Sequence, residues 1–176
     1  GAGYDLKGVV RRIVNGGRTP VEVADATHDI VIVGGGAAGI AVASSLLARK
    51  PRLDIAIIDP ADIHYYQPGW TLVGGGVFKP GTTARTMASV LPQGVHWIKS
   101  AVAAFEPERD AVILDGCRVV KYKQLVVCPG LKLDWHGIEG LTDTLGRNGV
   151  TSNYRYDLAP YTWHLVQQLH RGRAIF

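Results

Sequence analysis

The run HDIVIVGGGAAG, from His28 to Gly39, decides the fold of this 176-residue chain. Its first half contains the continuous β-branched stretch 30–33, which is typical of a strand buried on both faces of a sheet. Its second half is the pattern Gly34-x-Gly36-x-x-Gly39, and an apolar stretch rich in Ala and Leu follows. We therefore expect a strand, a glycine turn and a helix over 36–49, which is the context that this glycine pattern requires.

Each glycine of this pattern has a separate expected role. Gly34 makes the tight turn, Gly36 lets the backbone approach a pyrophosphate, and Gly39 lets the helix pack closely on the strand. The amides and the positive dipole at the helix N-terminus then favour a phosphate group. The pattern in this position therefore predicts a dinucleotide site.

A second predicted strand, 53–58, follows the helix and ends at Asp59. An acid about 20 residues beyond the glycine pattern can accept hydrogen bonds from the ribose hydroxyls of adenosine. A carboxylate in this position would repel a 2′-phosphate, so an unphosphorylated dinucleotide is expected. The fingerprint alone leaves FAD and NAD open.

The remaining pattern predicts an α/β fold: a Rossmann-like βαβ unit with a parallel sheet and an inserted antiparallel β-meander. We expect a helix over 4–14, a linker over 15–27, a loop over 61–81 and a short helix over 86–91. The meander strands are expected at 95–99, 101–105, 111–114 and 119–121. A further buried strand is expected at 124–128, an irregular segment at 131–151, a helix at 157–170 and the start of a strand at 174–176.

A meander inserted before the next parallel strand resembles the FAD domain of flavoprotein oxidoreductases with two dinucleotide-binding domains. The segment HYYQPGWTLVG, residues 64–74, makes the resemblance more specific. It is similar to the segment after the ribose-binding acid in sulfide:quinone oxidoreductases of the mitochondrial-like subclass. Four later segments are also similar, namely 88–99, 130–135, 137–141 and 152–154.

The resemblance implies FAD as the cofactor and gives roles to individual residues. Ala38 and Gly39 would meet the pyrophosphate, and Asp59 the ribose. Gln67 would approach the cofactor, Val102 would contact the adenine through its backbone, and Gly130 would let the chain pass close to the flavin. The expected cofactor-binding set is Gly34, Gly36, Ala38, Gly39, Asp59, Gln67, Val102 and Gly130.

The activity that the resemblance implies is oxidation of sulfide, with electrons passing through FAD to a quinone. Members of that family use a pair of redox cysteines, which we expect beyond residue 176, so this chain alone is expected to be inactive. Cys117 and Cys128 are expected to be structural, and no catalytic residue is assigned. Alternatives are a type II NADH dehydrogenase, a flavocytochrome sulfide dehydrogenase and a dinucleotide-binding module without turnover.

The expected domain organisation has three parts. Residues 1–27 would be an arm or the tail of an upstream domain, as in some bacterial relatives, and residues 28–150 the FAD-binding domain. Residues 151–176 would begin a second, truncated dinucleotide-fold domain. The abrupt apolar end at 174–176 and the first residue, Gly1, both favour a piece of a longer protein.

Charge and composition limit the partners. The net charge of +4 is scattered, which argues against a nucleic-acid surface. The histidines at 28, 96, 136, 164 and 170 show no metal spacing, so no metal is expected.

Residues 30–48 are uncharged, but three adjacent glycines would break a membrane-spanning helix. We expect a cytoplasmic protein, peripheral at the inner membrane through its quinone, and the sequence leaves a homo-oligomer open.

Overall fold

The computed structural model describes residues 24–176, and these residues divide into two compact units. Unit 1 comprises residues 24–61 and 91–129, and unit 2 comprises residues 62–90 and 130–176. The predicted helix at 4–14 and most of the predicted linker lie outside the described residues.

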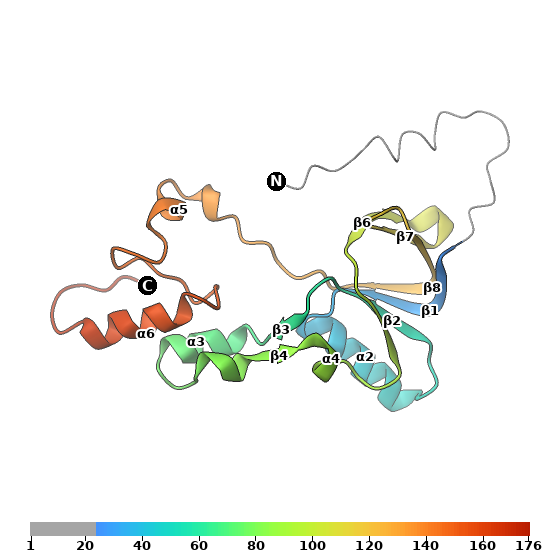
Figure 1. Ribbon diagram of the computed structural model, residues 1–176, viewed down its shortest axis with the longest axis horizontal. Coiled ribbons are helices and arrows are strands. Elements are labelled where there is room, and N and C mark those ends of the chain that lie inside the picture. The colour runs from blue at the N-terminus through green and yellow to red at the C-terminus, as the bar shows by residue number, and fades with distance from the viewer. Residues whose placement is uncertain (1–23) are drawn as a thin grey trace. The chain divides into compact units, whose positions relative to one another are not determined.

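Unit 1 is built on a six-stranded sheet with the order β5-β2-β1-β8-β7-β6. Strands β5, β2, β1 and β8 run parallel to one another, whereas β7 is antiparallel to β8 and β6 is antiparallel to β7. Figure 1 shows this sheet. The bounds are β1 (Ala26–Val33), β2 (Ile55–Ile58), β5 (Val95–Ile98), β6 (Val102–Glu106), β7 (Ala111–Leu114) and β8 (Val119–Val127). The predicted α/β class with a mainly parallel sheet is confirmed.

Both faces of the central strands are covered, which explains their unbroken apolar sequences. On one face, Ile32, Ile55 and Ile57 pack with Ala43 of helix α2 (Ala37–Arg49). On the other face, a second cluster joins β1 and β2 to β7 and β8; its fully buried members include Val31, Ala56, Val112 and Val120.

Two details of the predicted meander were wrong. Residues 95–98 form β5, which pairs in parallel with β2 and belongs to the main sheet. The segments 119–121 and 124–128, predicted as separate strands, form the single strand β8. This strand pairs with β7 in antiparallel fashion through its first residues and with β1 in parallel fashion along its length. A strand with half-exposed positions tolerates the polar residues that suggested a break.

Unit 2 contains a two-stranded antiparallel sheet and four helices among the described residues. Their bounds are β3 (Ile63–Tyr65), α3 (Pro68–Gly74), β4 (Ala84–Thr86), α4 (Met87–Val90), α5 (Leu141–Thr144) and α6 (Ala159–Gln168). Short 3₁₀ turns lie at Pro80–Thr83 and Trp135–Gly137, and a third, Pro107–Arg109, belongs to unit 1. Helices were correctly predicted near 86–91 and 157–170.

The prediction of a loop over 61–81 was wrong, because β3 and α3 lie there. Helix α3 begins with proline at its first position and contacts α6. Proline is favoured at a helix start, and packing stabilises a short helix whose glycines disfavour it. The strand expected to begin at 174–176 is absent from the described part of the chain.

A buried hydroxyl pair fixes α6 within unit 2. The Oγ1 atoms of Thr151 and Thr162 lie 2.8 Å apart, and Thr162 is buried. We expect Thr162→Val to lower the free energy of unfolding by about 1 kcal/mol, because the hydroxyl group loses its hydrogen bonds with Thr151 and the Leu158 carbonyl at nearly constant side-chain volume. Urea unfolding would measure this change. The exposed Thr142→Val is the control, and equal losses for both variants would contradict the prediction.

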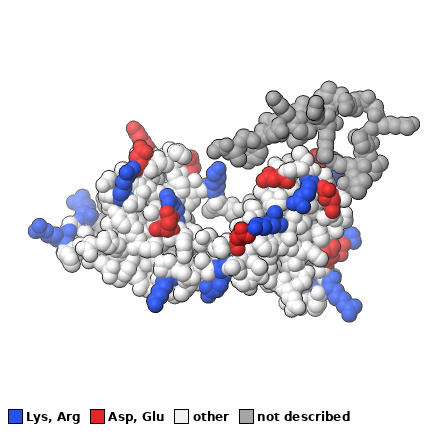
Figure 2. Space-filling view, in the orientation of Figure 1, with Lys and Arg blue, Asp and Glu red and all other residues white. Residues whose placement is uncertain are grey.

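Lys and Arg are mixed with Asp and Glu on the face shown in Figure 2, in each unit. Among residues 24–176, no helix is both long and apolar enough to cross a membrane. The uncharged run at 30–48 is instead divided among β1, the glycine turn and α2.

Candidate dinucleotide-binding site

The turn at Gly34 joins β1 to α2 at the carboxyl end of the parallel strands. Gly34 has φ +105°, a conformation that residues with a side chain rarely adopt. Its N–H donates to the Ile58 carbonyl at 2.9 Å. A Cβ atom here would lie 2.0 Å from the Cys128 carbonyl oxygen. Only glycine therefore lets the turn pass between the ends of β2 and β8.

Gly39 is the point of closest approach between α2 and the turn. A Cβ on Gly39 would lie 1.9 Å from the Gly34 carbonyl oxygen and 3.3 Å from Cγ2 of Ile32. Both atoms are held by buried structure, so neither can move away at low cost. The absence of a side chain at this position sets the distance between the helix and the strand.

Gly36 differs from the other two glycines because the space around it is open. A Cβ built on Gly36 meets nothing within 4 Å. Gly36 and the next two residues, Ala37 and Ala38, are exposed, and no side chain caps the N-terminus of the 13-residue helix α2. An uncapped helix N-terminus with small residues around it can accept a phosphate at close range.

Asp59 fastens the glycine turn to the end of β2. Its two carboxylate oxygens accept hydrogen bonds from the N–H groups of Gly35, at 2.7 Å, and Ala61, at 2.8 Å. Its carbonyl oxygen accepts a bond from the Trp97 indole N–H at 2.9 Å. Each carboxylate oxygen has a second lone pair, so Asp59 can also accept bonds from ribose hydroxyls. The sequence signals the acid, but it gives no sign of its bonds to Gly35 and Trp97.

The structure places the eight predicted cofactor residues in both units. Gly34, Gly36, Ala38, Gly39 and Asp59 lie together at the end of the parallel strands of unit 1. Val102 begins β6 and packs against the same apolar cluster as Val31. The other two residues belong to unit 2: Gln67 precedes α3, and Gly130, with φ +76°, follows β8. The cofactor contacts of all eight residues stay predictions.

Two segments of the family resemblance meet inside unit 2. The Tyr65 ring lies 5.8 Å from that of Trp70 and 4.8 Å from that of Tyr156, measured between centroids. Asn153 packs against Gly74, where a Cβ would lie 2.4 Å from the Asn153 Oδ1 atom. These contacts give Tyr65 a packing role within unit 2.

The two cysteines lie at different structural positions in unit 1. Cys117 is exposed in the turn between β7 and β8 with φ +64°, and Cys128 is half-buried at the end of β8. The Cys128 N–H donates to the Val33 carbonyl oxygen at 2.7 Å. The backbone of Cys128 thus helps to enclose the glycine turn, and the structural role expected for its thiol stays a prediction.

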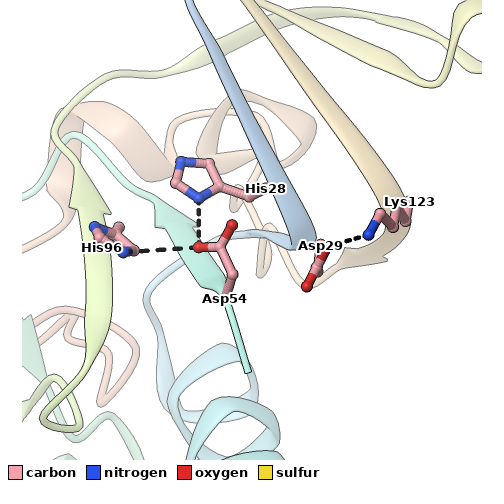
Figure 3. Close-up of polar contacts among 5 residues, drawn as sticks. All are labelled: His28, Asp29, Asp54, His96 and Lys123. Atoms are coloured by element: carbon pink, nitrogen blue, oxygen red, sulfur yellow. Dashed lines mark hydrogen bonds and ion pairs between the residues drawn. The ribbon is translucent and has the colours of Figure 1, made fainter. Parts of the chain in front are cut away.

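Two of the histidines that show no metal spacing in the sequence are neighbours in the structure. His28 and His96 lie on either side of Asp54 at the amino ends of the strands of unit 1 (Figure 3). Burial raises the pKa of Asp54, but the hydrogen bond and charge of His28, with a smaller contribution from His96, outweigh it. The net effect lowers the pKa of Asp54 below its ordinary value of 3.8. No spacing in the sequence signals this group, because strand pairing assembles it.

Residues 28–166 match the family model described as pyridine nucleotide-disulphide oxidoreductase. The chain is 45% identical over 149 residues to a mitochondrial sulfide:quinone oxidoreductase of Dictyostelium discoideum, and 34% identical over 149 residues to that of Mus musculus. These matches cover 84% and 85% of the chain but 33% of each relative, so the chain spans about a third of their length. Both relatives are eukaryotic, which gives no support to a bacterial source.

Among solved structures, the sulfide:quinone oxidoreductase of Aquifex aeolicus is similar, with a TM-score of 0.66 and 26% sequence identity. The match covers 81% of this chain and 32% of that one.

Proposed function

The chain belongs to the pyridine nucleotide-disulphide oxidoreductase family, and from this premise we propose that it is the FAD-binding part of a sulfide:quinone oxidoreductase. Members of this family are FAD-dependent oxidoreductases, so the cofactor follows from membership. The finer assignment rests on one observation: 45% identity to a sulfide:quinone oxidoreductase over most of the described chain. The relatives' printed names supply sulfide and quinone as the proposed substrates.

The residues present fit the nucleotide half of FAD. The open space at Gly36 and the uncapped start of α2 leave room for a pyrophosphate, to which Ala38 and Gly39 would contribute backbone amides. Asp59 is held in place by its own hydrogen bonds and would accept bonds from the ribose. Its negative charge disfavours a 2′-phosphate, which supports FAD over phosphorylated dinucleotides.

Three further contacts are part of the proposal. The backbone of Val102 would meet the adenine, and Gln67 and Gly130 would serve the flavin end of the cofactor. The positive φ of Gly130 supports the proposal that the backbone passes close to the flavin at this residue. The remaining parts of the proposal follow from the resemblance to sulfide:quinone oxidoreductases: a second dinucleotide-fold domain, a redox cysteine pair outside residues 1–176 and peripheral association with a quinone-containing membrane.

The contribution of this chain to the reaction would be binding and orientation. FAD, when bound, supplies the capacity to take two electrons from sulfide and to hand them to a quinone, which becomes a quinol. Asp59 would fix the adenosine end, and the small residues at the start of α2 would keep the pyrophosphate against the helix. These residues would set the position of the flavin, and none of them would contact sulfide.

The decisive experiment measures which dinucleotide the 176-residue chain retains. We expect equilibrium dialysis against FAD and NAD to show preferential binding of FAD, with the absorption spectrum of a bound flavin. We also expect no steady-state quinone reduction by this chain alone. A colourless protein that retains NAD would contradict the cofactor assignment. Sulfide-dependent bleaching of the flavin in a longer protein carrying this chain would separate the proposed enzyme from a non-catalytic module.

A further inference from the structure

We propose that His28, Asp54 and His96 form a binding site for a divalent transition-metal ion, with Zn²⁺ as the representative ligand. The three side chains offer two imidazole nitrogens and one carboxylate oxygen, all within 4.8 Å of one another (Figure 3). They lie in unit 1, with His28 on β1, His96 on β5 and Asp54 directly before β2; these three strands are neighbours in the sheet.

The parallel pairing of these strands sets the positions of the three residues. Ile55 pairs with Ile30 of β1 and with Val95 of β5. Asp54 directly precedes Ile55, His96 directly follows Val95, and His28 lies two residues before Ile30. The sheet therefore brings together residues from distant parts of the sequence and holds their backbones in place.

The ligand atoms are close to the spacing that a tetrahedral ion requires. Nδ1 of His28 lies 2.8 Å and Nε2 of His96 lies 3.6 Å from the same oxygen, Oδ1 of Asp54. Zinc bonds to nitrogen and oxygen of about 2.0–2.2 Å place tetrahedral ligands about 3.3–3.5 Å apart. Insertion of the ion thus requires the His28–Asp54 contact to open by about half an ångström or slightly more and the His96–Asp54 contact to close slightly. The two imidazole nitrogens, which with the oxygen lie within 4.8 Å of one another, must come to the same spacing.

Differences in exposure make this adjustment feasible. The side chain of His28 is 14% exposed and forms a fixed anchor, whereas those of Asp54 and His96 are 39% and 63% exposed. The two exposed side chains can rotate toward an entering ion at little packing cost. One imidazole would be enough to pair with Asp54, but a second one faces the same oxygen and supplies the third ligand.

The donor set decides the class of metal. Two imidazoles and one carboxylate suit Zn²⁺, Co²⁺, Ni²⁺ and Cu²⁺, whereas Mg²⁺ and Ca²⁺ prefer sites made only of oxygen. Three protein ligands leave a fourth position for water at a tetrahedral ion. The exposure of His96 places that position toward solvent.

The metal site is separate from the proposed FAD site. It lies at the amino ends of the strands, whereas Gly34 and Asp59 follow their carboxyl ends. From His28 to Val33, β1 rises by about 16 Å at about 3.3 Å per residue. A bound ion would therefore act on unit 1 by linking β1, β2 and β5, and would stabilise the folded state by mass action.

Titration of the 176-residue chain with Zn²⁺ against a chromophoric chelator tests the proposal, with a reductant present to keep Cys117 and Cys128 as thiols. We expect one tight equivalent per chain, a rise in Tm with Zn²⁺ and no competition from Mg²⁺. His96→Ala should weaken binding at least about 10-fold, since even outer-shell changes at metal sites cost about 10–100-fold. It should also reduce the rise in Tm at a given Zn²⁺ concentration.

The exposed His170→Ala is the matched control and should bind Zn²⁺ as the unaltered chain does. Asp54→Asn provides a second variant that removes a ligand charge while keeping the side-chain shape. Circular dichroism checks that each variant is folded. Zn²⁺ binding that His96→Ala and Asp54→Asn leave unchanged would overturn the proposal, as would the absence of a tight equivalent in the unaltered chain.

Discussion

Gly34→Ala is expected to destabilise unit 1 by about 3 kcal/mol or more. The new Cβ would lie 2.0 Å from the Cys128 carbonyl oxygen and 2.7 Å from its carbonyl carbon. Both atoms are backbone, so relief requires the end of β8 to move away from β1. The φ of +105° adds a conformational penalty, because alanine disfavours this region. Urea unfolding followed by circular dichroism would measure the loss.

Gly36→Ala is the matched control for this prediction. It adds the same methyl group two residues away, in the same turn, where nothing lies within 4 Å. Its free energy of unfolding should therefore stay close to that of the unaltered chain. If the proposed FAD site is correct, this variant should instead bind FAD more weakly, because the methyl group enters the space left for the pyrophosphate. Equal stability losses in the two variants would contradict the geometry of the turn.

Asp59→Asn should have the second largest effect, on both stability and FAD affinity. In the unaltered chain both carboxylate oxygens accept hydrogen bonds from backbone N–H groups, of Gly35 and Ala61. An amide has a single acceptor oxygen, so its NH₂ group must face one of these donors. Loss of one charged hydrogen bond costs about 1.5–3 kcal/mol.

If Asp59→Asn also loses a charged hydrogen bond to the ribose, the same cost of about 1.5–3 kcal/mol lowers the affinity for FAD by about 10–100-fold. Asp115→Asn, an exposed aspartate in the turn between β7 and β8, is the control for the change of charge. Equilibrium dialysis against FAD and urea unfolding, each carried out on the unaltered chain, Asp59→Asn and Asp115→Asn, would separate the effect on FAD affinity from the effect on stability. Unchanged FAD affinity in a folded Asp59→Asn protein would show that this residue does not contact the ribose.

The central βαβ element could be predicted from the sequence because its signals are local. The β-branched residues of β1, the glycine spacing and the acid at Asp59 all lie within about 30 residues, the usual extent of such a unit. Strand β7 could also be predicted from local signals, because its four residues are all apolar and buried and turn residues lie on both sides of it. In these segments, local preference and tertiary packing favour the same structure.

The wrong predictions arise where packing over long distances overrides local signals. Helix α3 contains two glycines and begins with proline, so its composition favours a loop, yet its contact with α6 stabilises it. Strand β8 contains Tyr122 and Lys123, the two residues that separate the predicted strands 119–121 and 124–128. Its pairing with β1 keeps the same register on both sides of Lys123, with Tyr122 opposite His28 and Gln124 opposite Ile30.

The group formed by His28, Asp54 and His96 could not be found from the sequence for the same reason. Metal-site patterns depend on short spacings within one turn or loop, whereas these residues come from three separate strands. Only the order and register of β1, β2 and β5 make them neighbours.

The pairing of β1 with β8 also has a consequence for how the chain folds. Val119 donates its N–H to Asp25 across a sequence separation of 94 residues, and β8 occupies the centre of the sheet beside β1. During synthesis, β1 and β2 emerge long before β8. Until β8 is made, one edge of β1 has no strand to pair with. Contacts this distant in sequence slow folding. We therefore expect slow refolding from urea and aggregation of truncated nascent chains that end before residue 119.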